Sequence, residues 1–325
     1  MEVRSIRYLW YTFAHLRCNL ATVGEEECPV IFIVGGTGTL GQTLVRMLRE
    51  QGHAVRVLVR PASLGKAEPL RALGAQLIGG DIRDAGSLAI ACRGATHVIC
   101  TTSAGADRRE SARRMAEFAG PIQLLRAAQA AGTVRQFLFT SALFPRSPVG
   151  YRFVWAKLMA EEAIQQSGMP YTILRPGGLF FELVQRGEPI VERFGFFPVV
   201  GVPGKRTQML GMHDAARAFV NALDNPAALN RTFELGGPQA LTFAAFCTIW
   251  AKVWGRPVPV RYLPVGLMRS LGWALQPFNP SAPGIIELLE FSYEEMCCDM
   301  RETSRVLRLE GMQTLEEYCR EYYGR

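Results

Sequence analysis

The residues with the clearest chemical meaning form a glycine-rich turn. Gly36, Gly38 and Gly41 have the spacing Gly-x-Gly-x-x-Gly between a predicted strand over residues 30–34 and a predicted helix that ends near Gly52. Glycines allow a sharp turn and a close approach of the backbone to a pyrophosphate, whose charge is met by the helix N-terminus. In this context the pattern predicts a dinucleotide site, made by Gly35, Gly36, Thr37, Gly38, Thr39, Leu40 and Gly41.

The end of the second predicted strand indicates which dinucleotide is held. A site that prefers NAD places an acid there, about 20 residues beyond the turn, to bind the ribose hydroxyls. Here that position is Arg60, residues 52–67 contain no acid, and Lys66 follows. A 2′-phosphate would meet positive charge, so NADP(H) is the preferred cofactor and NAD(H) the alternative. The competing interpretation is that Arg60 is a solvated strand-end residue.

A second cofactor contact is predicted at the end of the third strand. Asp81 follows Gly79-Gly80 and precedes Ile82, where a carboxylate could contact an adenine amino group. Asp81 could equally cap the helix that begins near Arg83-Asp84. The sequence leaves both interpretations open.

The elements that position these residues follow an alternating pattern. From Pro29 onward, β-branched runs alternate with helical patterns, which is typical of an α/β protein with a doubly wound parallel sheet, the Rossmann fold. The longest helical pattern covers residues 113–131, with a weak point at Gly120-Pro121. The predicted strands cover residues 30–34, 55–59, 75–78, 96–100, 135–140 and 171–174.

The chain divides into three predicted parts. Residues 1–28 form an N-terminal extension outside the fold, residues 29–177 an NAD(P)-binding Rossmann core, and residues 178–325 a smaller α/β subdomain for substrate or partner, with interleaved elements. Glycines and prolines in residues 177–204 predict a loop-rich stretch over the carboxyl ends of the strands. Short strands are expected at residues 231–235 and 258–262, and helices at residues 214–223, 242–254, 264–275 and 315–323.

The extension has three competing interpretations. Residues 1–23 are rich in arginine and aromatic residues and contain one acid, Glu2. A targeting peptide, an interfacial amphipathic segment, or a start site placed too far upstream would each account for this composition. The sequence favours none of them.

Composition narrows the classes of function. The net charge of +7 is spread along the chain and comes with no nucleic-acid-reading motif, so no nucleic acid is expected. No stretch of 18 uncharged apolar residues predicts a transmembrane segment. The eight cysteines lack metal-ligand spacing, which predicts no metal site and indicates the cytoplasm or another reducing compartment. Adjacent Cys297 and Cys298 are expected to be unpaired thiols rather than a redox pair.

Several segments resemble the atypical short-chain dehydrogenase/reductase family, in its NmrA-like branch, over most of residues 29–325. The C-terminal segment from Leu315 to Arg325 is similar to the end of photosystem II assembly-factor members of that family. Accessory subunits of respiratory complex I also belong to the family that the chain resembles, which implies them as further precedents for its function. The other segments that carry it are GGTGTLG at residues 35–41, GGDI at 79–82, AAxxAG at 127–132, LRPG at 174–177 and HDAA at 213–216.

The resemblance implies a proton relay, and this chain departs from it. Catalytic members of the wider superfamily use Tyr-x-x-x-Lys with an upstream serine, and the lysine lowers the pKa of the tyrosine. Lys157 fits the lysine and Ser141 the serine, so both are the candidate catalytic residues, and Lys157 is also expected to bind the nicotinamide ribose. Phe153 stands where the tyrosine belongs. Tyr151 is a poor substitute unless the helix begins after it.

The missing tyrosine leaves two candidate functions. The first is an NADP(H)-binding regulatory or assembly protein with little or no catalysis, which contacts a protein partner or a membrane-associated complex and is then peripheral to a membrane. The second is an NADPH-dependent reductase of a ketone, enone or quinone, and the sequence does not identify the substrate. A third function, nucleotide-sugar epimerase or dehydratase, is disfavoured because Phe153 replaces the tyrosine on which that chemistry depends. The apolar residues 263–278 could dock a partner or membrane, although a core helix is the favoured interpretation.

Overall fold

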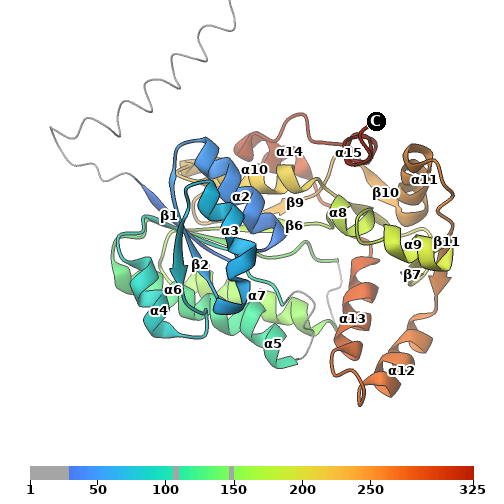
Figure 1. Ribbon diagram of the computed structural model, residues 1–325, viewed down its shortest axis with the longest axis horizontal. Helices are drawn as coiled ribbons and strands as arrows, with labels where there is room; N and C mark the ends of the chain where they lie inside the picture. Colours follow the sequence, from blue (N-terminus) through green and yellow to red (C-terminus); the bar gives the residue numbers. More distant parts are fainter. Residues whose placement is uncertain (1–28, 105–109, 146–149) are drawn as a thin grey trace, which may run out of the picture.

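The computed structural model describes residues 29–104, 110–145 and 150–325. Its centre is a seven-stranded sheet with the strand order β3-β2-β1-β4-β5-β6-β9, in which all neighbours are parallel (Figure 1). The predicted doubly wound Rossmann fold is therefore confirmed. The strands are β1 (Val30–Val34), β2 (Ala54–Val59), β3 (Gln76–Gly79), β4 (His97–Cys100), β5 (Gln136–Thr140), β6 (Tyr171–Pro176) and β9 (Arg231–Leu235).

Side-chain alternation along β1 explains why both faces of the sheet are covered. Ile31 and Ile33 pack on one face and Phe32 and Val34 on the other, as expected for a strand that is buried on both sides. One face is covered by α2 (Thr39–Glu50), α3 (Leu64–Ala72), α10 (Met212–Ala222) and α14 (Met300–Leu307). The other is covered by α4 (Ala85–Cys92), α6 (Gly120–Ala131) and α7 (Arg152–Gln166).

The long helical pattern over residues 113–131 is not one regular helix. It comprises α5 (Glu110–Arg114), a π-helical turn over Met115–Ala119 and α6. The predicted weak point at Gly120-Pro121 lies where the π-helical turn ends. Such turns place one extra residue in a helix and so re-aim its side chains, and they occur often at functional sites.

The second half of the chain contributes a smaller set of elements beside the carboxyl ends of the central strands (Figure 1). Residues 177–204 are less loop-rich than the sequence predicts, because they contain two short helices and a strand. The strand over residues 231–235 is β9, which pairs with β6 in the central sheet. The other elements are α8 (Phe180–Leu183), α9 (Glu188–Phe194), β7 (Phe197–Val200), β8 (Arg206–Gln208), β10 (Ala240–Thr242), α11 (Phe243–Trp254), β11 (Val260–Leu263) and α15 (Leu315–Tyr322).

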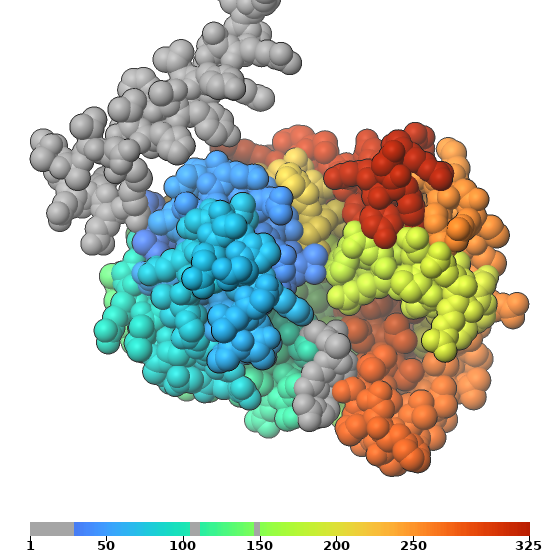
Figure 2. All heavy atoms as spheres, in the orientation of Figure 1, coloured from blue at the N-terminus to red at the C-terminus, as the bar shows by residue number. Residues whose placement is uncertain are grey.

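One helical hairpin extends from this part of the protein. It consists of α12 (Val265–Leu275) and α13 (Ala282–Ser292), which pack against each other and form the lowest part of the molecule in Figure 2. The favoured interpretation of residues 263–278 as a core helix is wrong, because most of α12 is exposed. Within the described ranges, no helix is long and apolar enough to cross a membrane.

Candidate functional site

The glycine turn lies between β1 and α2, at the carboxyl edge of the sheet. Gly35 has a positive φ of 92°, which glycine adopts without strain, and its carbonyl accepts a hydrogen bond from the Gly38 N–H at 2.9 Å. A Cβ on Gly41 would lie 2.3 Å from the Gly35 oxygen, and a Cβ on Gly36 would lie 2.5 Å from Val57 Cγ1. The fold therefore requires glycine at position 41 for the close approach of α2 to the turn, and at position 36 for the close approach of the turn to β2.

The N-terminus of α2 is open to a phosphate. Gly38 is its N-cap residue, no side chain caps it, and no acid lies in its first turn. The first N–H groups of a helix have no partner within the helix, and together with the helix dipole they favour an anion. The turn contains Thr37, Thr39 and Leu40, of which Thr39 is exposed. These residues thus fit a dinucleotide pyrophosphate.

Arg60 directly follows β2, as the sequence predicts, and its side chain is exposed. Lys66 is exposed on α3. Within the described chain no ion pair occupies either cation, so both remain available to a 2′-phosphate.

Asp81 and Ile82 follow β3 at the same edge. Asp81 accepts hydrogen bonds from the Nε and Nη2 of Arg83 at 2.9 and 2.7 Å, and the hydrogen bond from the Arg83 side chain holds the pKa of Asp81 below its ordinary value. The cap of α4 is Asp84 and not Asp81, because the Asp84 side chain accepts from the N–H groups of Gly86 and Ser87. Ile82 packs against the buried cluster under α4 and α6.

Lys157 is buried on α7 and has two partners. Its Nζ lies 2.7 Å from Oε2 of Glu117 and donates to the carbonyl of Thr140 at 2.8 Å. Glu117 belongs to the π-helical turn, and its other oxygen accepts from the N–H of Ala104 at 3.1 Å. The hydroxyl of Thr140 is buried beside them and has no hydrogen-bond partner in the described part of the chain. This end of β5 therefore combines a paired lysine with an unsatisfied hydroxyl.

Ser141 directs its hydroxyl to a different ion pair. It donates to Glu161 of α7, and Glu161 is bound by the guanidinium of Arg175 at 2.6 Å. Ser141 and Glu161 are both buried. The structure thus brings Ser141 and Lys157 to the same strand end but gives them separate carboxylate partners.

Phe153 lies in an apolar cluster. Its ring is 4.5 Å from that of Phe291 on α13, in an edge-to-face arrangement. Tyr151 precedes α7, so the condition under which it could replace the missing tyrosine is met. However, its hydroxyl lies 3.2 Å from a carboxylate oxygen of Glu294 and 3.4 Å from one of Glu290, so its single proton is shared between them, and burial beside these carboxylates raises the pKa of Tyr151. The contacts described for Phe153 and Tyr151 are thus with α13 and with Glu290 and Glu294, and not with the ammonium of Lys157.

Three residues at this strand end are not predicted from the sequence, namely Glu117, Glu161 and Arg175. Glu117 carries a weak signal, since it is an acid within an apolar helical pattern between Met115 and Phe118. Glu161 is four residues after Lys157, which places it on a neighbouring part of the same helix face. Only the fold shows that each carboxylate neutralises a different cation.

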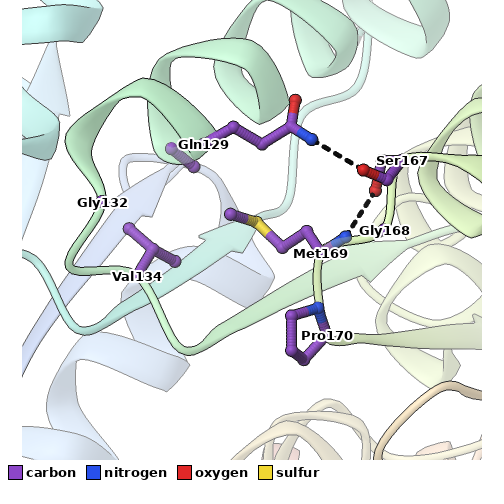
Figure 3. Close-up of a pocket in the computed structure, with 8 residues that line it drawn as sticks. Gln129, Gly132, Val134, Ser167, Gly168, Met169 and Pro170 are labelled. Atoms are coloured by element: carbon purple, nitrogen blue, oxygen red, sulfur yellow. Dashed lines mark hydrogen bonds between the residues drawn. The ribbon is translucent and has the colours of Figure 1, made fainter.

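A separate depression lies at the opposite edge of the sheet, before β5 and β6 (Figure 3). Its volume is about 330 Å³, and Gln129 crosses it to donate to the carbonyl of Ser167 at 2.8 Å. Its lining contains none of the predicted site residues and no charged side chain. We therefore place the candidate site at the glycine turn and the end of β5.

Comparison with known proteins shows the family of this chain. Residues 28–319 match the model of the NmrA-like family. The chain belongs to the NmrA-like family. It is 33% identical to the NAD(P)H azoreductase of Xenophilus azovorans over 74% of this chain and 79% of the relative, and 28% identical to the photosystem II assembly factor Ycf39 of Trieres chinensis over 91% and 93%.

A solved structure with the same fold contains a nicotinamide cofactor. The NADPH-dependent quinone oxidoreductase QOR2 of Escherichia coli, complexed with NADPH, has a TM-score of 0.73 over 90% of this chain and 99% of its own. The two sequences are 23% identical, so this likeness concerns the fold. The relatives of this chain include one named for cofactor-dependent reduction and one named for assembly.

Proposed function

We propose that this protein binds NADP(H) at the glycine turn and acts mainly as a regulatory or assembly protein. The observation that carries the cofactor proposal is the uncapped, acid-free N-terminus of α2 together with Arg60 at the end of β2. An anion at the first site and a second phosphate at Arg60 would both meet positive potential. The azoreductase relative, whose name includes NAD(P)H, supports the same cofactor.

Different residues would bind different parts of the dinucleotide. The backbone from Gly35 to Gly41 would hold the pyrophosphate, Arg60 the 2′-phosphate, and Asp81 with Ile82 the adenine end. Lys157 and the hydroxyl of Thr140 would face the nicotinamide ribose at the end of β5, because Lys157 already lies there and Thr140 needs a partner. When bound, NADPH would supply a hydride.

The proposal of a regulatory role is supported by the residues at the tyrosine, serine and lysine positions of the proton relay. Phe153 has no hydroxyl, Ser141 donates to Glu161, and Lys157 is neutralised by Glu117. Proton transfer to a substrate requires a donor within hydrogen-bond reach, and none of these groups is free to provide one without breaking a buried contact. The cofactor would then act as a structural or sensing ligand. Residues 178–325 would carry the contacts to a partner in a membrane-associated complex, which the assembly-factor relatives support.

A reductase remains the second candidate. The unsatisfied Thr140 hydroxyl favours it, since this is a polar group at the predicted nicotinamide end that could bind a substrate carbonyl or relay a water proton. The 33% identical azoreductase also favours it.

One experiment separates the two functions. The purified protein is titrated with NADPH and NADH, and the complex is then mixed with quinones, azo dyes and α,β-unsaturated ketones while absorbance at the reduced-nicotinamide band is followed. Tight NADPH binding without oxidation supports the regulatory proposal, and rapid oxidation supports the reductase instead. Failure to bind either nucleotide would refute both.

A further inference from the structure

The α12–α13 hairpin has one packed side and one bare side. Gly272 of α12 lies against α13, where a Cβ on it would be 3.0 Å from Ile286 Cγ1. This close approach fixes α12 on α13 and leaves the outer surface of α12 uncovered, as Figure 2 shows for the part of the hairpin that faces the viewer. We define the apolar tip as the five most exposed large apolar side chains here, namely Leu267 (64%), Leu271 (45%), Trp273 (63%), Leu275 (44%) and Phe278 (87%).

The apolar tip spreads around the helix. Each residue turns a helix by about 100°, so the tip residues within α12, from Trp273 through Leu267 to Leu275, cover an arc of roughly 200°. A groove on a partner protein usually takes one narrow stripe of a helix. Side chains that point in many directions are instead suited to a fluid medium that closes around them, as at the surface of a bilayer.

The apolar tip also lacks free charge. Residues 264–286 contain a single charged side chain, Arg269. Its Nε and Nη2 donate to the two carboxylate oxygens of Glu290 on α13, each at 2.8 Å. The hairpin end can therefore leave water without stranding an unpaired charge.

Two basic residues precede the hairpin, on β11 and at the end of α9. Arg261 of β11 lies over the ring of Phe196 at 5.0 Å, and Arg193 lies over the ring of Phe194 at 5.5 Å. Both arginines are exposed, and neither has an ion-pair partner among the residues that the structure describes. Because β11 leads directly into α12, Arg261 lies near the base of the hairpin, and Arg193 lies at the end of α9, just before the strand β7 that pairs with β11.

We propose that the α12–α13 hairpin docks on an anionic lipid surface. The apolar tip enters the boundary between headgroups and acyl chains, and Arg193 and Arg261 contact the headgroup phosphates. Charge complementarity selects this occupant, because an uncharged apolar end beside unpaired cations matches the layers of an anionic bilayer. In a dimer formed through this hairpin, the arginines of the two copies would face each other and repel. This inference does not depend on cofactor binding.

The test is sedimentation of the full chain with vesicles. Phosphatidylcholine vesicles with 30% phosphatidylglycerol should bind the protein, and pure phosphatidylcholine vesicles should bind it several-fold less. The double variant Trp273→Ser/Phe278→Ser should lower the partition coefficient at least tenfold, because two exposed aromatic side chains no longer enter the interface. Arg193→Gln/Arg261→Gln should reduce binding to the level of the neutral vesicles.

A matched control separates insertion from general stickiness. Leu64 and Ile90 are 50% and 58% exposed on α3 and α4, which cover the two faces of the central sheet away from the hairpin, so Leu64→Ser/Ile90→Ser should bind vesicles as the parent does. Absence of vesicle binding, or unchanged binding by the hairpin variant, would overturn the proposal. So would a dimer, detected by light scattering, that the hairpin variant dissociates while its vesicle binding stays intact.

Discussion

The Nζ of Lys157 lies 2.7 Å from the Oε2 of Glu117, and both side chains are buried. The pair joins α7 to the π-helical turn beside the end of β5. It has a consequence for any ligand at this end of the sheet, because a hydroxyl that bonds to Lys157 must share the ammonium with Glu117.

The first prediction concerns this pair. Glu117→Gln should lower the free energy of unfolding by about 3–5 kcal/mol, because it leaves the charge of Lys157 buried without its counterion. Urea denaturation measures the change. Glu117→Gln/Lys157→Met, which removes both charges, should recover a large part of the loss. Equal stability of the single variant and the parent would show that the pair does not form.

The candidate site was predictable only in part, and the reason is visible in this pair. The glycine turn and Arg60 can be recognised because their positions are local: a strand, a turn, a helix and the next strand end. The partners of Lys157 and Ser141 come from other elements, and nothing in the spacing of Glu117 or Glu161 says which cation each will face. Such pairings are decided by the tertiary fold.

The fold shows the same division. The strands of the central sheet are predicted closely because β-branched residues bounded by turns give a strong local signal. The sequence underestimates the regular structure of residues 177–204 because glycines and prolines interrupt the helical pattern, although α8 and α9 still form by packing into the cluster around Trp250. It also misjudges residues 263–278, since an apolar helical pattern does not say whether the protein or something outside it covers the helix.

The second prediction concerns cofactor choice. Arg60→Ala should raise the Kd for NADPH by roughly ten- to a hundredfold, the range expected for loss of a charged hydrogen bond, and should change the Kd for NADH less than about threefold. Fluorescence titration with both nucleotides measures this selectivity. Lys66→Ala is the control for loss of a nearby positive charge and should have a smaller effect. Equal losses for both nucleotides from Arg60→Ala would contradict recognition of the 2′-phosphate.

The third prediction concerns the turn itself. Gly41→Ala should destabilise the protein by about 1–3 kcal/mol and weaken NADPH binding, because its Cβ would be placed 2.3 Å from the Gly35 oxygen and would push α2 away from β1. Gly65→Ala is a matched control in α3, where a Cβ meets nothing within 4 Å. It should leave binding unchanged and stabilise the protein by up to about 1 kcal/mol. Thermal denaturation and NADPH titration of both variants give the comparison.

The fourth prediction concerns pH. His97 is buried at the start of β4, between the Thr96 hydroxyl and Asp224, each at 3.0 Å. Burial lowers the pKa of His97 below its ordinary value near 6.5, assisted by Arg135 and opposed by Asp224. The unfolded chain therefore binds more protons just below pH 6.5, so stability should fall as the pH drops through this window.

A variant isolates the histidine responsible. His97→Asn should reduce the slope of unfolding free energy against pH below about 6.5. Burial lowers the pKa of His53 as well, so His53→Asn must be measured beside it to assign the remaining slope. A slope that His97→Asn leaves unchanged would mean that His97 titrates alike in the folded and unfolded chains.

The last prediction tests whether the missing tyrosine can be restored. Phe153→Tyr recreates Tyr-x-x-x-Lys in sequence, yet it should not create a reductase, because the ring packs edge-to-face on Phe291 within an apolar cluster. A hydroxyl added there would be buried without a partner and should cost about 1–3 kcal/mol of stability. Phe153→Leu, which keeps the site apolar, is the control for repacking. NADPH oxidation with quinones and azo dyes is measured for each variant, and turnover that appears only in Phe153→Tyr would show that the new phenol reaches the nicotinamide end despite Phe291.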